Sequence, residues 1–319
     1  MKTKCIFSKQ NKHGKANMEN KKVAVIMSTY NGEKFVREQL DSILNQTYPN
    51  IEIVVRDDGS KDDTVKIIKE YEKKHNNIRL YEGPNLGFIK SFFKLLEIAN
   101  ADYYAYADQD DVWMENKIEL AVNLLDKQDD SKPNMAFGNS DYYDENMNLL
   151  GKGETHRKCE FKRALFACIT QGMTMTINKT TRDYIVKNPP KNCFFHDWWT
   201  YLICISMGNV SYSDVTTVKY RRMKTNATSE GQGVFSVLKW RIKNLLINNQ
   251  IKDIKEQMIN FKNIYYDELD DDKKKLLDLF ADDKYNFFRA LRKTFYPKRL
   301  RAKIMDEIML RFIFLFGIL

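Results

Sequence analysis

The chain has 319 residues, of which 43% are hydrophobic and 30% are charged. Such a composition can bury a core, and the length suits one large α/β domain with an appendage or two modest domains. The net charge of +9 is compatible with an anionic partner such as a nucleotide, a nucleic acid or an acidic lipid.

The five cysteines exclude two structural classes. Their number is odd and none forms a CxxC pair, so neither a disulfide framework nor a zinc site is expected, and a reducing cytosol fits best. Residues 1–20 are basic and lack the apolar core of a signal peptide, so we expect a disordered tail. No apolar run reaches 18 residues, so no spanning helix is expected.

The first half alternates short apolar runs with amphipathic segments. The apolar runs predict four strands, at Val23–Ser28, Ile51–Val55, Ile78–Glu82 and Tyr103–Ala107. Helices are predicted between them: one carries Val36, Leu40, Ile43 and Leu44 and ends before Pro49, one covers KDDTVKIIKEYEKK, and one runs from Phe88 to Ala99. The alternation indicates βαβ units and a mostly parallel, doubly wound α/β sheet.

Polar loops follow three of these strands, at Thr29–Glu33, Arg56–Ser60 and Asp108–Asp111. Ligands of such sheets bind beyond the carboxyl ends of the strands. We therefore expect the three loops to converge on one site.

The second half is less regular. It predicts a strand at Met173–Asn178, a helix at His196–Gly208 and a pair of short strands within Asn209–Arg222. From Phe235 the pattern is helical and is interrupted only by Pro297. We expect a catalytic domain over 21–228 and a helical, basic and amphipathic C-terminal region over 229–319.

Asp108, Asp110 and Asp111 are crowded together after a buried strand. Such carboxylates repel one another unless a cation lies among them, and Mg²⁺ or Mn²⁺ prefers oxygen ligands. A solvated acidic loop or a helix cap before Trp113 is the structural alternative. Asp57 and Asp58 could bind a donor base or ribose, although on their own they are better explained as a turn with Ser60 capping the next helix. An aromatic in Thr29–Asn31 could stack on a base or fill the loop.

The segment VAVIMSTYNGEKFVREQLDSILNQTYPNIEIVVRDDGSKDDT resembles the opening of family 2 glycosyltransferases with the GT-A fold. ADQDDVW resembles their D-x-D metal motif, and TQGMTMTIN and HDWWTYLI resemble their acceptor-side segments. The resemblance covers roughly Lys21 to Arg222. It is strongest to bacterial rhamnosyltransferase-like members, which build capsule, O-antigen or cell-wall polysaccharides.

The resemblance implies roles for individual residues. Asp197 would be the catalytic base, Asp110 and Asp108 would bind Mn²⁺ or Mg²⁺, and Tyr30 and Asp58 would hold the nucleoside. The full set that it assigns to the nucleotide-sugar is Thr29, Tyr30, Asn31, Glu33, Asp57, Asp58, Asp108 and Gln109. Family members often carry Glu-Asp where this chain has His196-Asp197, so the role of His196 stays open. From the residues alone, Asp197 could equally be an N-cap.

Four further residues could face the acceptor. Trp198 and Trp199 could stack on a sugar, but adjacent helix positions point in different directions, so core packing is the default for one of them. Arg221 and Arg222 could meet a diphosphate or an acceptor phosphate, or end a strand in solvent.

Lys284 to Lys303 contains eight basic residues and no acid, and the chain then ends in the apolar segment IMLRFIFLFGIL. A basic amphipathic stretch with an apolar end favours attachment to an anionic membrane surface, at the cytoplasmic face. The alternative is a helical subdomain that packs on the sheet domain.

The predicted enzyme is thus an inverting, metal-dependent glycosyltransferase. It would move a sugar, for which rhamnose from dTDP-rhamnose is one candidate, from a nucleotide diphosphate donor to a lipid-linked saccharide acceptor. Two alternatives remain: a nucleotidyltransferase, disfavoured because STYNGEKF lacks a glycine-rich phosphate loop, and a non-catalytic nucleic-acid-binding protein. Against the second, the basic residues cluster near the end of the chain and not in the sheet domain, so no nucleic-acid partner is expected.

Overall fold

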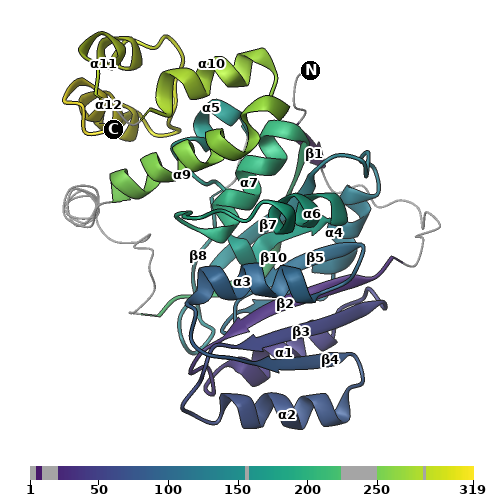
Figure 1. The fold of residues 1–319 in the computed structure, drawn as a ribbon. Coiled ribbons are helices and arrows are strands. Elements are labelled where there is room, and N and C mark those ends of the chain that lie inside the picture. Colours follow the sequence, from purple (N-terminus) through teal and green to yellow (C-terminus); the bar gives the residue numbers. More distant parts are fainter. Residues whose placement is uncertain (1–4, 9–20, 155–157, 224–249, 283–284) are drawn as a thin grey trace.

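The computed structural model describes residues 5–8, 21–154, 158–223, 250–282 and 285–319. Within these ranges ten strands form one mixed sheet in the order β1-β10-β7-β9-β5-β2-β3-β4, with β6 beside β10 and β8 beside β7 (Figure 1). The strands are β1 (Cys5–Ser8), β2 (Val23–Thr29), β3 (Ile51–Asp57), β4 (Ile78–Glu82), β5 (Tyr103–Ala107), β6 (Val112–Trp113), β7 (Asn134–Tyr143), β8 (Leu149–Gly151), β9 (Met175–Asn178) and β10 (Asn209–Arg221).

The helices cover both faces of this sheet. Those of the first domain are α1 (Val36–Leu44), α2 (Thr64–Lys74), α3 (Phe88–Ile98), α4 (Lys117–Leu125), α5 (Phe161–Ala164), η1 (Gly172–Thr174), α6 (Lys179–Lys187) and α7 (His196–Met207). Those of the C-terminal region are α9 (Gln250–Tyr265), η2 (Tyr266–Glu268), α10 (Asp271–Phe280), α11 (Phe287–Thr294) and α12 (Ile304–Leu315).

Alternation along β2 explains the two layers. Val23, Val25 and Met27 pack with α1, α2 and α4 on one face, whereas Ala24 and Ile26 pack with α3, α6 and α7 on the other. Successive side chains of a strand point to opposite faces, so an unbroken apolar run is what a strand covered on both sides requires.

The pairing confirms the α/β expectation. β2 pairs in parallel with both β3 and β5, and β3 pairs in parallel with β4. β9 is antiparallel to β5 and β7, so the sheet is mixed toward its second half.

Two expectations about strands were wrong. Asn209–Arg221 is one long strand, not two, because a bulge absorbs extra residues between the pairs Tyr212–Phe137 and Thr216–Asn139. In the predicted disordered tail, residues 5–8 form β1 and pair in parallel with β10. Residues 1–4 and 9–20 lie outside the described residues, as does the predicted boundary near residue 228.

The C-terminal helices share a core with the sheet domain. Phe166 packs against Phe280 and Phe314, with ring centroids 5.1 and 5.5 Å away, and Trp199 packs against Phe261 at 5.6 Å. The described C-terminal region is therefore fastened to the first domain by buried aromatic contacts. Among the described helices, none combines the length and apolarity needed to span a membrane.

Candidate active site

The three predicted loops meet at the carboxyl edge of β2, β3 and β5. The backbone N–H of Tyr30 donates to Oε1 of Gln109 at 2.8 Å, and Nε2 of Gln109 donates to the carbonyl of Tyr30 at 3.1 Å. The N–H of Asn31 donates to Oγ of Ser60 at 2.9 Å. A Cβ at Gly32 would lie 2.3 Å from Oε1 of Gln109, so a side chain at this position would displace the Gln109 amide from Tyr30. The expected convergence is confirmed.

Asp57 organises its own loop. Its buried carboxylate accepts hydrogen bonds from Oγ1 of Thr29 (3.0 Å) and from the N–H groups of Gly59 (3.0 Å) and Ser60 (2.8 Å). The structure thus gives Asp57 and Thr29 a loop-building arrangement, with their oxygens directed at each other and at the loop backbone.

Asp58 joins the second loop to helix α3. Its buried carboxylate pairs with Arg56 and accepts the N–H groups of Leu86 (2.9 Å) and Gly87 (2.8 Å) at the start of α3. A carboxylate at a helix N-terminus is favoured by the helix dipole and by the unpaired N–H groups there. Asp58 still forms part of the wall of the neighbouring cavity.

A cavity of about 560 Å³ opens between these loops. Of the predicted nucleotide and metal residues, the structure brings five to its wall: Tyr30, Asp58, Asp108, Gln109 and Asp110. Asn31 and Glu33 do not line it, because their side chains accept the N–H groups of Lys61 and Asp63 at 2.8 Å each.

Sequence reasoning missed part of this wall. The remaining lining residues are Ser28, Asn85, Gly87, Phe88, Phe92, Tyr220 and Met223. Asn85 and Gly87 belong to the turn that follows β4, at the same sheet edge as the other three loops. The rule that predicted those loops applies equally to this fourth one and could have found it.

The acidic cluster is crowded and poorly solvated. Burial, and then the neighbouring Asp110 and Asp197 carboxylates, raises the pKa of Asp108 to about 7. Burial also raises the pKa of Asp110, which Arg221 opposes, and the pKa of Asp111 rises because of burial and its two acidic neighbours. Asp111 does not line the cavity; it accepts the N–H of Arg221 at 3.0 Å, and its Oδ2 has no hydrogen-bond partner among the described residues.

Arg221 holds the acidic loop in place. It is 1% exposed, and its Nε donates to the carbonyl of Asp110 at 2.7 Å while its other nitrogens reach the Glu145 carbonyl and the Glu38 carboxylate. Its guanidinium also lies 4.4 Å from the ring centre of Phe35. The predicted contact of Arg221 with a ligand phosphate is thus not supported, because protein groups already surround the guanidinium. Arg222 is partly buried, over the ring of Tyr142 at 4.6 Å.

Asp197 stands at the first turn of α7, where it accepts the N–H of Gly172 (3.1 Å) and its neighbour Trp198 (2.7 Å). Burial outweighs these hydrogen bonds and raises its pKa to about 6. Such a carboxylate is ionised at neutral pH and is more basic than an ordinary aspartate, as a general base requires.

The three residues around Asp197 belong to the core. Trp198 and Trp199 are 4% and 0% exposed, so the idea that one stacks on an acceptor sugar is not supported by the structure. His196 is buried and stacks on Phe92 with a centroid distance of 4.1 Å. Burial lowers its pKa to about 3, which keeps the ring neutral.

Comparison with known proteins decides the class. The family model for glycosyl transferase family 2 matches residues 24–194. The chain belongs to this family. It is a glycosyltransferase, which decides against the nucleotidyltransferase and the non-catalytic binding protein.

Two curated relatives illustrate the family. The chain is 29% identical over 222 residues to the dTDP-rhamnosyl transferase RfbG of Shigella flexneri, covering 63% of this chain and 72% of the relative. It is 26% identical over 216 residues to WfgD of Escherichia coli, a UDP-Glc:alpha-D-GlcNAc-diphosphoundecaprenol beta-1,3-glucosyltransferase, covering 66% of this chain and 81% of the relative.

Solved structures agree on the GT-A fold. TarS of S. aureus, residues 1–349 with UDP-GlcNAc, has a TM-score of 0.54 and 17% identity, and the match covers 93% of this chain and 92% of that one. The mannosyltransferase PcManGT of Pyrobaculum calidifontis has a TM-score of 0.51 and 18% identity, covering 93% and 74%. At this identity the likeness concerns the fold alone.

Proposed function

We propose that this glycosyltransferase transfers a sugar, with inversion, from a nucleotide diphosphate donor to a hydroxyl of a lipid-linked saccharide in cell-surface polysaccharide synthesis. The observation that carries the proposal is the cavity whose wall combines Tyr30, Gln109 and two acidic side chains of one loop. Asp197 is nearby, because its neighbour His196 stacks on Phe92 of the same wall. We take dTDP-rhamnose as the first donor to test because RfbG is named a dTDP-rhamnosyl transferase.

Tyr30 and Phe88 are suited to the nucleoside. They are 46% and 51% exposed, and both line the cavity. Exposed aromatic rings offer faces on which a base can stack, and Asn85 adds an amide that can donate and accept hydrogen bonds. Asp58 would act mainly by fixing the loop that carries Asn85.

Asp108 and Asp110 would hold a divalent metal, Mn²⁺ or Mg²⁺. Both line the cavity, and a cation bound between them would offset the burial of the two carboxylates and the repulsion of Asp108 by Asp110. Among the described residues no three His, Cys, Asp or Glu side chains form a metal site on their own, which suits an ion whose other ligands are donor phosphates and water. When bound, the ion would neutralise charge on the departing diphosphate. PcManGT was determined with GDP-Man and Mn²⁺.

Asp197 would remove the proton of the acceptor hydroxyl. A hydroxyl is a poor nucleophile at neutral pH, and a carboxylate held by two backbone N–H groups is oriented for this transfer. One base acting opposite the leaving group gives a single displacement, and therefore inversion at the anomeric carbon. The chain's part in catalysis is thus to hold the donor and orient one base.

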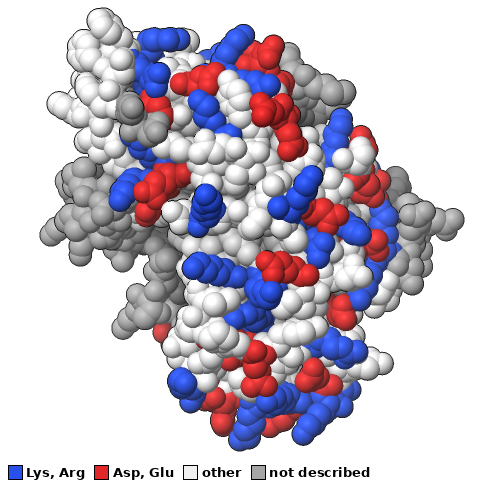
Figure 2. All heavy atoms as spheres, viewed as in Figure 1, with Lys and Arg blue, Asp and Glu red and all other residues white. Residues whose placement is uncertain are grey.

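The C-terminal region would attach the enzyme peripherally to the cytoplasmic face of the membrane. Large apolar side chains of α11, α12 and their flanks are exposed and form what we call the apolar patch. Its members are Tyr285, Phe287, Phe288, Phe295, Ile304, Met305, Ile308, Phe312, Leu315, Phe316 and Ile318. In the upper left of Figure 2, where Figure 1 places α11 and α12, the outermost lobe carries no charged residues, and Lys and Arg side chains lie along its inner edge.

The basic residues contribute less to this attachment than their number in the sequence implies. Lys293 is buried and pairs with Asp282, as does Arg289, and Lys303 pairs with Glu154. Arg292, Lys298 and Arg299 are exposed and would supply the charge that meets anionic lipid, at about 1 kcal/mol each. Large exposed apolar patches are typical of interaction sites. The name of WfgD, with its diphosphoundecaprenol acceptor, supports a lipid-linked substrate.

The test is a donor hydrolysis and binding screen with dTDP-rhamnose, UDP-, GDP- and CDP-sugars, with Mn²⁺, with Mg²⁺ and with a chelator. We expect one nucleotide to bind far more tightly with metal than with chelator. Binding of no nucleotide-sugar under any condition would overturn the proposal.

A further inference from the structure

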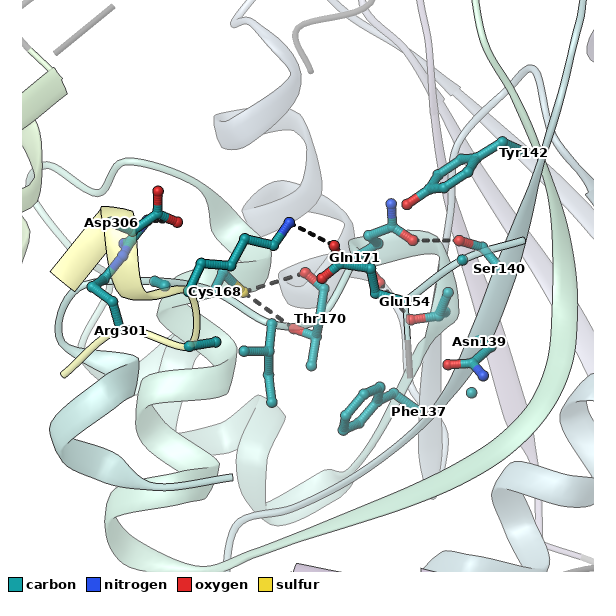
Figure 3. Close-up of a pocket in the computed structure, with 17 residues that line it drawn as sticks. Phe137, Asn139, Ser140, Tyr142, Glu154, Cys168, Thr170, Gln171, Arg301 and Asp306 are labelled. Atoms are coloured by element: carbon teal, nitrogen blue, oxygen red, sulfur yellow. Dashed lines mark hydrogen bonds and ion pairs between the residues drawn. The ribbon is translucent and has the colours of Figure 1, made fainter. Parts of the chain in front are cut away.

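A second cavity, of about 250 Å³, lies between the sheet domain and the C-terminal region (Figure 3). Strand β7 and the segment 167–174 form one wall, and residues 301–306 form the other. It shares no lining residue with the donor cavity. The volume is below the roughly 300–1,000 Å³ of pockets that take drug-sized molecules, and thus suits one sugar ring.

The wall from the sheet domain offers neutral polar groups beside an aromatic ring. Figure 3 shows Gln171 bonded to Ser140, and Thr170 beside Cys168, around the same space as Phe137. Amides and hydroxyls can both donate and accept hydrogen bonds, as sugar hydroxyls do, and an aromatic ring suits the apolar face of a sugar.

The charges of the cavity are balanced. Nζ of Lys303 lies 2.6 Å from Oε1 of Glu154, and Nη2 of Arg301 lies 3.8 Å from Oδ2 of Asp306. An anionic ligand such as phosphate is bound where positive charge is in excess. With each base paired to an acid, this cavity favours an uncharged ligand.

The cavity adjoins the proposed base. Gln171 lines it, and the next residue, Gly172, donates its N–H to Asp197 at 3.1 Å. On the donor side, His196, the residue before Asp197, stacks on Phe92 of the donor cavity with ring centroids 4.1 Å apart. Asp197 therefore lies next to residues of both cavities.

On its other side the cavity meets the apolar patch. Ala302 and Lys303 line the cavity, and the next two residues, Ile304 and Met305, are 66% and 64% exposed members of the patch. A sugar bound here would have the base on one side and the membrane-facing surface on the other. A sugar attached to a lipid requires this arrangement, because its reacting hydroxyl must face the base while its lipid end stays at the membrane.

We propose that this cavity binds one uncharged sugar ring of the acceptor, and that residues 301–306, outside the family-defining segment, select that sugar. The inference rests on the proposed function, because it presupposes a saccharide acceptor and Asp197 as its base.

The test uses the full chain and the variant Ala302→Trp. Ala302 is exposed, so the indole can enter the cavity without disturbing the core. Asn263→Trp is the matched control, since Asn263 is exposed on α9 of the same C-terminal region and does not line the cavity. Methyl glycosides of rhamnose, glucose, galactose and N-acetylglucosamine are titrated by NMR with the preferred nucleotide present, and inorganic phosphate is titrated in parallel.

We expect at least one glycoside to bind the parent and the control, and Ala302→Trp to weaken it more than about tenfold, while nucleotide affinity is unchanged. A second variant, Lys303→Glu, places like charges at the cavity rim and should weaken the glycoside, and Glu154→Lys added to it should restore binding. The proposal is overturned if no glycoside binds the parent, if Ala302→Trp binds it equally well, or if phosphate binds instead. If the parent chain binds no nucleotide at all, the proposed function itself is refuted.

Discussion

Replacing Asp197 with Asn should separate catalysis from folding. The amide cannot accept a proton from the acceptor, and a general base contributes about 10²–10⁴-fold, or about 3–5 kcal/mol of barrier. We expect turnover to fall by that factor while the nucleotide Kd stays within about twofold, because Asp197 does not line the donor cavity. Asp183→Asn, on the exposed side of α6, is the control.

Stability should change in the opposite direction. Burial raises the pKa of Asp197 from 3.8 to about 6, so ionising this group in the folded protein costs about 3 kcal/mol more than in the unfolded chain. Asn keeps one acceptor but loses the other backbone hydrogen bond, which costs about 1 kcal/mol. A net gain of about 1–2 kcal/mol should raise the melting temperature at pH 7.

The pH dependence supplies the assay. The folded state holds the Asp197 proton more tightly than the unfolded chain does. The free energy of unfolding therefore falls as the pH rises from about 4 to about 6, and above that range this contribution stays constant. The advantage of Asp197→Asn should grow over that range, and parent turnover should fall about tenfold per unit below about pH 6. Loss of nucleotide affinity with normal turnover at saturation would make Asp197 a binding residue, and a lower melting temperature would make it a structural cap.

Three other substitutions test the remaining groups. Asp110→Ala should abolish metal-dependent nucleotide binding, measured by calorimetry with Mn²⁺ and with chelator, and equal affinities under both conditions in the parent would contradict the metal assignment. Arg221→Lys should lower the free energy of unfolding, measured by urea denaturation, by about 2–4 kcal/mol, because one ammonium cannot replace a guanidinium that contacts three oxygens. An unchanged denaturation midpoint would show that Arg221 does not stabilise the acidic loop. Phe288→Ser with Phe295→Ser should cut co-sedimentation with anionic vesicles more than about tenfold, whereas Ser at the exposed pair Leu149–Leu150 should not, and equal losses would deny the apolar patch a special role.

Local patterns were sufficient to predict the first half of the fold. Val23–Met27 and Tyr103–Ala107 are unbroken apolar runs because both sheet faces are covered, and each is followed by polar residues at the end of its strand. The convergence of those loops followed from the parallel direction of the strands alone. The bulge in β10 was not predictable. The polar residues around Asp214 are compatible both with a turn between two strands and with a bulge inside one strand.

Within the site, the sequence predicted proximity better than it predicted roles. Asp57 and Asp58 are adjacent in the sequence and have similar composition around them, but one carboxylate closes its own loop and the other caps α3. The difference depends on the turn after β4, which lies 28 residues from Asp58. Likewise, Trp198 and Trp199 follow the base directly, yet both are buried in the core. Trp199 packs against Phe261 of α9, whereas Trp198 packs against Phe194 and donates its indole N–H to the Ala164 carbonyl.

The charge of the C-terminal region also depends on tertiary contacts that the sequence does not reveal. Counting Lys284 to Lys303 gives eight bases and no acid, but the acids that pair with them lie just outside that window, at Asp282 and Asp306, or far away at Glu154. A window in the sequence therefore overstates the net charge of a surface whenever tertiary contacts bring in partners. The exposed apolar side chains need no such correction. Their exposure is measured in the folded chain, so tertiary contacts have already been taken into account. We therefore expect membrane binding by this region to persist at high salt to a greater extent than the sequence implied. Ile304 and Met305 of the apolar patch directly follow Ala302 and Lys303 of the second cavity, so the two features adjoin along the chain.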